Sequence, residues 1–446
     1  AEQLTSRPDV ANAISRIISA ASQLAVVVRP PLLTICDATM IYHLPSCLRF
    51  FEASHIPELL SSAGPAGLSV IEISASVGVD SVKISHILRL LATHHLVRER
   101  EPDVFALNRV SALLDSGRSF TECRAAPEKK YDAEGGGVAA LAALNTDELF
   151  KASAYFTDAL LSSPETTSKH TGPKLAPTAF NLSQRTTLSY WTWLETPENS
   201  TRLARFARAM AGTEGWMGAS DAELCAFPFP DLAEGALVVD VGGGIGSTTL
   251  RLAQRFPKLR FIIQDREPVC KLGEDAWQIH SPNLIKSDRV RFQVHDFFKP
   301  QPKHDNNIKA AVFILRVVCH DWPDVLARRI LLQLRRAADE AAPDKKPTYL
   351  VIGDHLLPYA CTGARESEPK VQGGTEALRG ARWPLLANLG GASTNAYWLD
   401  MTMQVTLGGQ ERTLPELRSL AESAGWRLIR VARTEGSLFA YVVAEP

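Results

Sequence analysis

Residues 237–249 constrain the fold of this chain more than any other segment. They begin with the apolar run Leu237–Val241, break into glycines at positions 242, 243, 244 and 246, and continue into a helix-like sequence from Ser247. This order predicts a buried strand, a tight turn and a helix start. Glycine tolerates positive φ and lacks a Cβ, so a ligand can lie directly against such a turn. The spacing is G-x-G-x-G and not the G-x-G-x-x-G of a dinucleotide site. The pattern alone therefore leaves two interpretations open, a nucleoside-cofactor site and a merely tight turn.

Four further apolar segments predict strands that lead into polar residues. The segments 259–265, 290–298, 310–318 and 348–354 lead to Asp265, Asp296, His320 and Asp354. In open α/β sheets, ligands bind at the carboxyl ends of the strands. A lone aspartate there could equally cap a helix, but a series of acids with a histidine indicates a site. The sequence therefore predicts a doubly wound α/β sheet with a ligand site at the strand ends.

The C-terminal half resembles the S-adenosylmethionine-dependent O-methyltransferases that methylate plant phenolics, and their fungal relatives. Five motifs carry the resemblance, and their order and spacing match: 239–246 (VDVGGGIG), Asp265, Asp296-Phe297, 316–322 (RVVCHDW) and 408–413 (GGQERT). The resemblance implies a Rossmann-like, seven-stranded methyltransferase sheet preceded by a mainly helical winged-helix dimerisation domain. It also implies S-adenosylmethionine as methyl donor, S-adenosylhomocysteine as product and no metal ion.

The resemblance assigns cofactor-binding roles to residues along the strand ends. They are Gly242, Gly243 and Gly244 for the methionine part, Asp265 for the ribose hydroxyls, Asp296 and Phe297 for the adenine, and Arg316 and Trp322 beside the cofactor. Trp322 could stack on the adenine, although a buried tryptophan at a helix start is equally ordinary.

Methyl transfer to a phenol needs a base, because a phenol has a pKa of about 10 and a histidine one of about 6.5. His320 follows the fourth predicted strand and matches the catalytic histidine of the resembling family, so we expect it to be the general base. The alternative is a helix-start histidine, because 321–324 (DWPD) is also typical of a helix start. By motif matching, Glu411 and Asp354 flank the base and Asp321 is the acid beside it. The family often has glutamate where Asp354 stands, and a shorter side chain puts its reach in doubt.

An aromatic acceptor would be held by aromatic and methionine side chains, which contact a flat ring without demanding particular hydrogen bonds. Met210 and Met401 hold the best-matched positions. Aromatic residues at helical spacing are more often core residues, so each position stays a hypothesis. The full set is Trp191, Trp193, Phe206, Met210, Trp216, Met401 and Met403.

The whole chain sets broad limits on function. Its 446 residues predict two domains, which we place at 1–185 and 186–446. A net charge of −1 with 22% charged residues argues against a general binder of nucleic acid or membrane surfaces. No run of about 18 uncharged apolar residues and no signal-peptide pattern is evident, so we expect a cytoplasmic protein without a membrane span. The seven cysteines form no C-x-x-C pair, which predicts reduced thiols and no zinc site.

Residues 69–107 predict a winged-helix unit of helix, turn, helix and hairpin. A DNA-binding unit would present basic residues on its second helix. Here that helix offers Lys83, Ser85 and Arg89 among many apolar residues, and the wing is acidic, with Glu99 and Asp103. The resembling family uses this unit to form homodimers. The many apolar residues of the second helix fit a dimer interface better than they fit a DNA-binding surface.

The leading hypothesis is an O-methyltransferase that acts on a phenolic or other aromatic hydroxyl of a small molecule. Some fungal relatives in the resembling family bind S-adenosylmethionine yet catalyse a pericyclic or dehydrative step in secondary metabolism, and this stays open as an alternative. A winged-helix regulator and a dehydrogenase fit the motifs less well. Segment 359–395 is longer than the connection that is usual in the family. It is either a flexible loop or a lid over the substrate.

Overall fold

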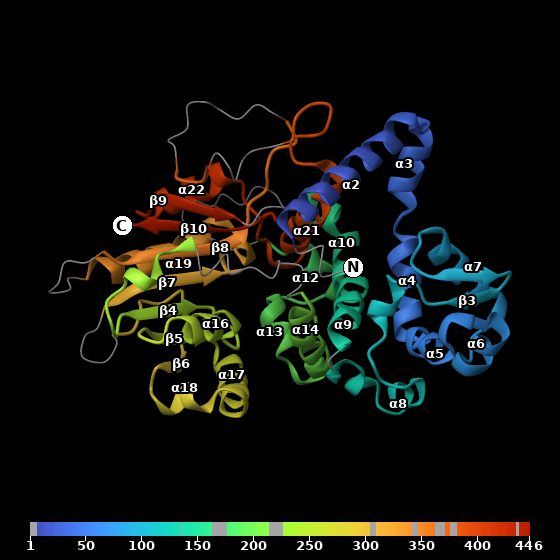
Figure 1. Cartoon of the computed structure of the whole chain (residues 1–446), viewed down its shortest axis with the longest axis horizontal. Coiled ribbons are helices and arrows are strands. Elements are labelled where there is room, and N and C mark those ends of the chain that lie inside the picture. The colour runs from blue at the N-terminus through green and yellow to red at the C-terminus, as the bar shows by residue number, and fades with distance from the viewer. Residues whose placement is uncertain are drawn as a thin grey trace. The chain divides into compact units, whose positions relative to one another are not determined.

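The computed structural model describes residues 7–133, 135–162, 176–213, 226–303, 309–340, 347–361, 371–374, 381–433 and 437–446. The chain forms two compact units (Figure 1). The helical unit comprises Val26–Met217 and Val405–Leu407, and the sheet unit comprises Ala1–Ala25, Gly218–Gln404 and Gly408–Pro446. Our division into domains 1–185 and 186–446 stays a prediction. Much of the predicted insertion, 362–370 and 375–380, lies outside the described residues.

The sheet unit contains the predicted seven-stranded sheet, in the order β6-β5-β4-β7-β8-β10-β9. The strands are β4 (Leu237–Val241), β5 (Arg260–Asp265), β6 (Val290–Val294), β7 (Ala310–Arg316), β8 (Tyr349–His355), β9 (Arg427–Arg433) and β10 (Phe439–Glu445). Strands β4 to β8 pair in parallel, and β10 pairs antiparallel with β8 and β9. The chain passes from β4 to β5 on one side and reaches β7 on the other, so the strand order reverses at β4. Ligands bind at such a switch point in doubly wound sheets.

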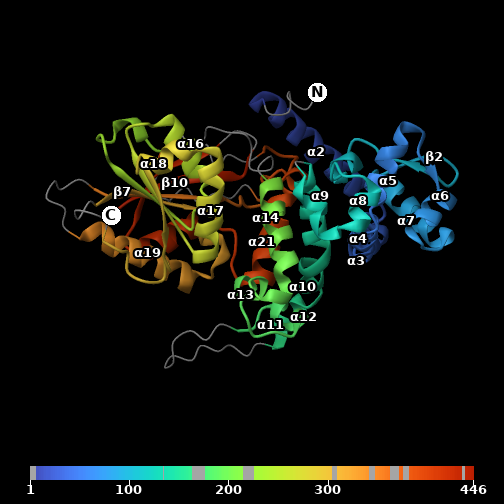
Figure 2. The ribbon, with the colours of Figure 1, turned by 90° about the horizontal axis from the view of Figure 1, so that it is seen from below.

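Helices cover both faces of this sheet because alternate strand residues point in opposite directions. Val239 and Val241 pack in the buried cluster that contains Leu331 of α19 (Asp324–Asp339) and Leu417 of α22 (Leu414–Ser423). Asp240 points to the other face and accepts a hydrogen bond from Thr249 of α16 (Ser247–Arg255) at 2.7 Å. Figure 2 shows α16 and α19 on opposite sides of the strands. The other helices of this unit are α2 (Pro8–Val28, whose last three residues belong to the helical unit), α17 (Glu267–His280), α18 (Pro282–Lys286) and α21 (Thr394–Leu407, whose last three residues also belong to the helical unit).

The predicted winged-helix unit is present in the helical unit. Helices α6 (Val70–Val77) and α7 (Ser81–Thr93) precede a hairpin of β2 (Arg98–Glu101) and β3 (Val104–Ala106), and β1 (Leu68–Ser69) completes a three-stranded sheet. Ser85 and Arg89 of the second helix both donate hydrogen bonds to the carboxylate of Asp103 in the wing. The acidic wing therefore binds two of the groups that a DNA-binding helix would present to phosphates.

The rest of the helical unit is a set of packed helices around aromatic residues. Tyr190 and Trp193 of α13 (Tyr190–Leu194) pack with Phe180 of α12, and Tyr190 also contacts Phe206 of α14 (Ser200–Gly212). A 3-10 turn, Pro127–Asp132, precedes α9, which begins at Gly136. The remaining helices are α3 (Pro31–Met40), α4 (His43–Ala53), α5 (Ile56–Ala63), α8 (Phe120–Ala125), α9 (Gly136–Leu144), α10 (Phe150–Ala154), α11 (Phe156–Ser162) and α12 (Ala179–Gln184).

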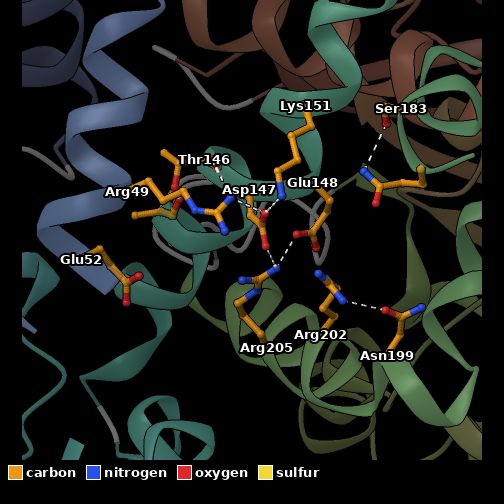
Figure 3. A network of polar contacts seen from close by, with 12 residues as sticks. Arg49, Glu52, Thr146, Asp147, Glu148, Lys151, Ser183, Asn199, Arg202 and Arg205 are labelled. Carbon is orange, nitrogen blue, oxygen red and sulfur yellow. Dashed lines mark hydrogen bonds and ion pairs between the residues drawn. The ribbon is translucent and has the colours of Figure 1, made fainter. Parts of the chain in front are cut away.

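A network of ion pairs links α14 to a π-helical turn, Asn145–Leu149, which lies between α9 and α10 (Figure 3). Arg205 of α14 pairs with Glu148 and lies 3.4 Å from Asp147. Asp147 also binds Arg49 of α4 and Lys151 of α10. The Glu148 side chain is 1% exposed and that of Arg205 is 14% exposed, so neither charge is solvated by bulk water.

We predict that Arg205→Met lowers the free energy of unfolding of the helical unit by about 3–5 kcal/mol, because it leaves the Glu148 carboxylate buried without its cation. Urea unfolding followed by circular dichroism measures the loss. Arg208→Met, one turn along α14, is the matched control, since Arg208 and Asp132 form a half-exposed pair worth less than about 1 kcal/mol. Equal stability of the two variants would contradict the prediction.

Helix α2 bears on the expectation that no segment spans a membrane. By length and composition alone it is apolar enough to cross a bilayer, although it carries Asp9 and Arg16. A single helix of this kind near the N-terminus is weak evidence of a span. Each cysteine among the described residues is a free thiol, as predicted.

Candidate active site

The glycine-rich turn after β4 has a backbone conformation that residues with a Cβ rarely adopt. Gly242, Gly244 and Gly246 have φ of 70°, 60° and 84°, where other residues are strained. A Cβ on Gly243 would lie 2.7 Å from Cγ of Asp240, whereas a Cβ on Gly244 would meet open space. The turn is therefore closed toward the sheet and open on the side where a ligand can approach.

Asp265, at the end of β5, is held against this turn. Its Oδ2 accepts a hydrogen bond from the backbone N–H of Gly244 at 2.9 Å, and its Oδ1 accepts one from the N–H of Arg266 at 2.8 Å. A carboxylate has about four acceptor positions, so two remain for ligand hydroxyls. This arrangement fits the ribose of S-adenosylmethionine.

The residues predicted for the adenine lie after β6 and β7. Phe297 and Phe298 pack edge-on against Trp322, with ring centroids 5.9 and 4.9 Å apart. Asp296, with a 48% exposed side chain, accepts a hydrogen bond from the N–H of Phe298 at 3.0 Å. Arg316, at the end of β7, donates to Tyr441 Oη of β10 at 3.1 Å. Trp322 thus has the packing role that the sequence left open, and the adenine contacts stay predictions.

His320 lies in a 3-10 turn, Cys319–Asp321, directly after β7 and is 8% exposed. Its Nδ1 is 2.6 Å from Glu411 Oε1, and its Nε2 is 3.4 Å from Asp321 Oδ1. An ionised carboxylate only accepts hydrogen bonds, so Nδ1 is the donor to Glu411. In the neutral imidazole, Nε2 is then the nitrogen that can take a proton. The structure therefore brings together the predicted base and its predicted partner, 91 residues apart in sequence.

The acids around His320 change its protonation. Burial lowers the pKa of His320, but the carboxylates of Glu411 and Asp321 outweigh burial and raise it to about 10. Burial raises the pKa of Asp321 to about 6 and that of Asp354 to about 7. Asp354 is 5% exposed, and its Oδ1 has no hydrogen-bond partner among the described residues. Asp354 therefore contributes to the charge environment of His320, while the direct contact is the one to Glu411, and the role of Asp354 as a flanking acid stays a prediction.

Sequence reasoning missed three residues of this site. His355, 6% exposed, places Nδ1 3.8 Å from Glu411 Oε1, so a second imidazole shares that carboxylate. Asp400 of α21 accepts a hydrogen bond from the N–H of Glu411 at 2.9 Å. Arg412 donates to the loop that carries His320. The available signals were the position of His355 beside Asp354 and that of Arg412 beside Glu411.

The residues predicted to bind the acceptor fall in both units. Trp193, Phe206 and Met210 belong to the helical unit, while Met401 and Met403 of α21 belong to the sheet unit. Trp193 and Phe206 pack in the aromatic cluster, as the core interpretation predicts. Met210 and Met401 are 39% and 40% exposed. Trp216 lies outside the described residues, and the assignment of these residues to an acceptor pocket stays a prediction.

Among the described residues, no cluster of three or more His, Cys, Asp or Glu side chains is arranged to hold a metal ion. The glycine turn, with its open side at Gly244, and the Asp265 carboxylate do fit a nucleoside cofactor.

Comparison with known proteins identifies the family of this chain. Residues 184–345 match the family model for the O-methyltransferase domain. An O-methyltransferase of Armillaria gallica is 36% identical over 100% of this chain and 91% of its own length. A 4-O-methyltransferase of Phanerochaete chrysosporium is 35% identical over 96% of this chain and 87% of its own.

Solved structures share the fold at lower identity. Mitomycin 7-O-methyltransferase MmcR aligns with a TM-score of 0.64 and 21% identity, covering 96% of this chain and 100% of its own. LepI in complex with S-adenosylmethionine aligns with a TM-score of 0.67 and 22% identity, covering 97% of this chain and 94% of its own. With the glycine turn, Asp265 and the sheet order, these relatives establish that the chain belongs to the S-adenosylmethionine-dependent O-methyltransferases.

Proposed function

We propose that this enzyme transfers the methyl group of S-adenosylmethionine to a phenolic or other aromatic hydroxyl of a small molecule, with His320 as the general base. The observation that carries the proposal is the buried contact of 2.6 Å between His320 Nδ1 and Glu411 Oε1. This contact directs Nε2 away from the carboxylate, so that nitrogen can accept the hydroxyl proton.

The cofactor supplies an already activated methyl group on a sulfonium, so the protein has three tasks. The glycine turn and Asp265 bind and orient the donor. His320 accepts the acceptor's proton at Nε2, and the Glu411 carboxylate stabilises the resulting imidazolium. The neighbouring carboxylates raise the pKa of His320 to about 10, which makes the neutral imidazole a stronger base toward a phenol, and only the neutral fraction of His320 can accept the proton. Holding donor and acceptor in line supplies much of the remaining rate.

A pericyclic or dehydrative step is the second candidate function. One observation favours it: LepI aligns as well as the methyltransferases, and a structure described as a pericyclic reaction enzyme aligns with a TM-score of 0.66. At 21–22% identity these likenesses establish the fold alone. The His320–Glu411 pair supports proton abstraction and therefore methyl transfer.

Incubation with methyl-labelled S-adenosylmethionine and a panel of phenolic compounds tests the proposal. We expect a product heavier by one labelled methyl group, together with S-adenosylhomocysteine. Conversion of a compound without any gain of label would support the second candidate instead.

We further propose that the enzyme is a cytoplasmic homodimer that joins through its N-terminal region. Exposed apolar side chains on α2 and α3 support this, among them Ile17, Val27, Leu32 and Ile35, each more than 60% exposed. Light scattering at micromolar concentration checks the assembly state, and a monomer would contradict the proposal.

We predict that Asp265→Ala weakens binding of S-adenosylhomocysteine by about 10- to 100-fold, the value of a lost hydrogen bond to a charged group. Calorimetry measures the dissociation constant without requiring turnover. Asp288→Ala is the matched control, since Asp288 is an exposed aspartate of the same unit that lies at the amino ends of β5 and β6, opposite the carboxyl ends where the cofactor is predicted. Unchanged affinity in Asp265→Ala would remove Asp265 from the cofactor site.

A further inference from the structure

The loop that carries His320 has an unusual backbone. Val317, between β7 and His320, has φ of 51°, a conformation that β-branched residues rarely adopt. Its N–H donates to Gly353 O of β8 at 2.8 Å. A strained conformation of this kind persists only when the surrounding structure determines it from several sides. The loop therefore depends on contacts from outside itself.

Arg412 supplies most of those contacts. Its Nη1 donates to Cys319 O at 2.9 Å, and its Nη2 donates to Trp322 O at 2.8 Å. Asp324 is the first residue of α19, and its Oδ1 accepts hydrogen bonds from Nε and Nη2 of Arg412 at 3.0 and 2.8 Å. The Arg412 side chain is 3% exposed. A planar guanidinium with five donors can make such a set of contacts, whereas a lysine ammonium cannot.

The neighbours of Arg412 complete the contact with the loop. The N–H of Gln410 donates to His320 O at 2.8 Å, and a Cβ on Gly409 would lie 2.1 Å from the same oxygen. Glu411 holds the His320 imidazole. Residues 409–412 thus bind the backbone carbonyls on both sides of His320. They also bind the carbonyl and the side chain of His320.

We propose that Arg412 is a positioning residue for catalysis, which holds the 319–322 backbone so that the His320 imidazole stays aligned with Glu411. This inference rests on the proposed role of His320 as the base. Arg412 acts through the loop and not on the substrate. The charged groups that face His320 are Glu411, Asp321 and Asp354, and the Arg412 side chain donates its hydrogen bonds to other groups, although its charge lowers the pKa of Asp354.

The test compares Arg412→Lys and Arg412→Met with wild type. Lysine keeps the cation but cannot bridge two carbonyls and a carboxylate, so it separates geometry from charge. We expect both variants to lower kcat by about 10- to 100-fold, the usual effect of displacing a reacting group by about 1 Å. The KM for S-adenosylmethionine should change less than about threefold, because most of its predicted ligands follow β4, β5 and β6 and only Trp322 lies on the loop that Arg412 holds.

A second readout needs no turnover. In protein labelled with 15N-histidine, NMR titration follows the pKa of His320, which we expect to fall by about one unit or more when the contact with Glu411 loosens. Arg335→Met is the matched control: Arg335 donates to Gly425 O in the same unit, away from the site, and its loss should leave both readouts unchanged. Asp324→Asn should shift both readouts in the same direction by less, and its 63% exposed side chain makes it the variant to use if the Arg412 variants fail to fold.

The outcomes separate this inference from the proposed function. A wild-type protein that methylates no phenol contradicts the proposed function, and the titration alone then decides the role of Arg412. Variants that keep both kcat and the His320 pKa at wild-type values overturn the inference. So does an Arg412→Lys protein with full activity, because the guanidinium geometry would then be dispensable.

Discussion

Replacing His320 with alanine should lower kcat for methyl transfer by about two to four decades, the usual effect of removing a general base. The physical reason is that no other group described near Glu411 can take the acceptor's proton in the same place. His355 shares the carboxylate, but burial lowers its pKa, and its Nδ1 lies 3.8 Å from Glu411. Product mass after incubation with methyl-labelled cofactor measures the rate.

The cofactor site should survive this substitution. Most of its predicted residues follow β4, β5 and β6, and the two near His320, Arg316 and Trp322, keep their own side chains in the variant, so calorimetry should give wild-type affinity for S-adenosylhomocysteine. His94→Ala, at the exposed end of α7, is the control and should keep full activity. An active His320→Ala enzyme would leave the proposed mechanism without its base.

The second large effect is expected from Glu411→Gln, which keeps the size of the side chain but removes its charge. The carboxylate favours the imidazolium, so its loss should lower the pKa of His320 from about 10. An opposite charge this close is worth about 1–3 pKa units. His320 must be neutral to act as a base, so the rising limb of the rate against pH should move to lower pH in the variant.

The same substitution should lower the plateau rate by about two to three decades, because the imidazolium that forms during the reaction is no longer stabilised. A profile of kcat/KM from pH 6 to pH 11 shows both effects at once. Glu422→Gln, an exposed position on α22, is the control. If the limb moves to higher pH or stays in place, Glu411 does not set the pKa of His320.

Much of the sheet could be predicted from the sequence because β4, β5, β7 and β8 are short, mainly apolar runs between turn residues. Leu237–Val241 and the glycines after it also fixed the position of the ligand site, since only glycine fits the observed turn. Pairing His320 with Glu411 was different. Nothing local to either residue indicates a contact across 91 positions, and only the resemblance to a family supplied it.

The residues that the sequence missed share one physical cause. His355, Asp400 and Arg412 act through contacts with residues that are not their neighbours in the chain, so proximity to Asp354 or Glu411 in the sequence does not indicate what they contact. The strain at Val317 was equally hidden, because valine ordinarily favours extended backbone and its conformation here is imposed from outside. Trp193 and Phe206 show the opposite problem, in that an aromatic pattern at helical spacing fits a core as well as a pocket.

The crowding between Gly409 and the His320 carbonyl has a consequence for how such an enzyme can evolve. Every amino-acid replacement reachable from a glycine codon by one nucleotide change adds a Cβ, and here that atom would lie 2.1 Å from a backbone oxygen of the catalytic loop. We therefore expect every such replacement of Gly409 to disturb the loop that carries His320. We expect substitutions that alter the choice of acceptor to arise at positions other than 409.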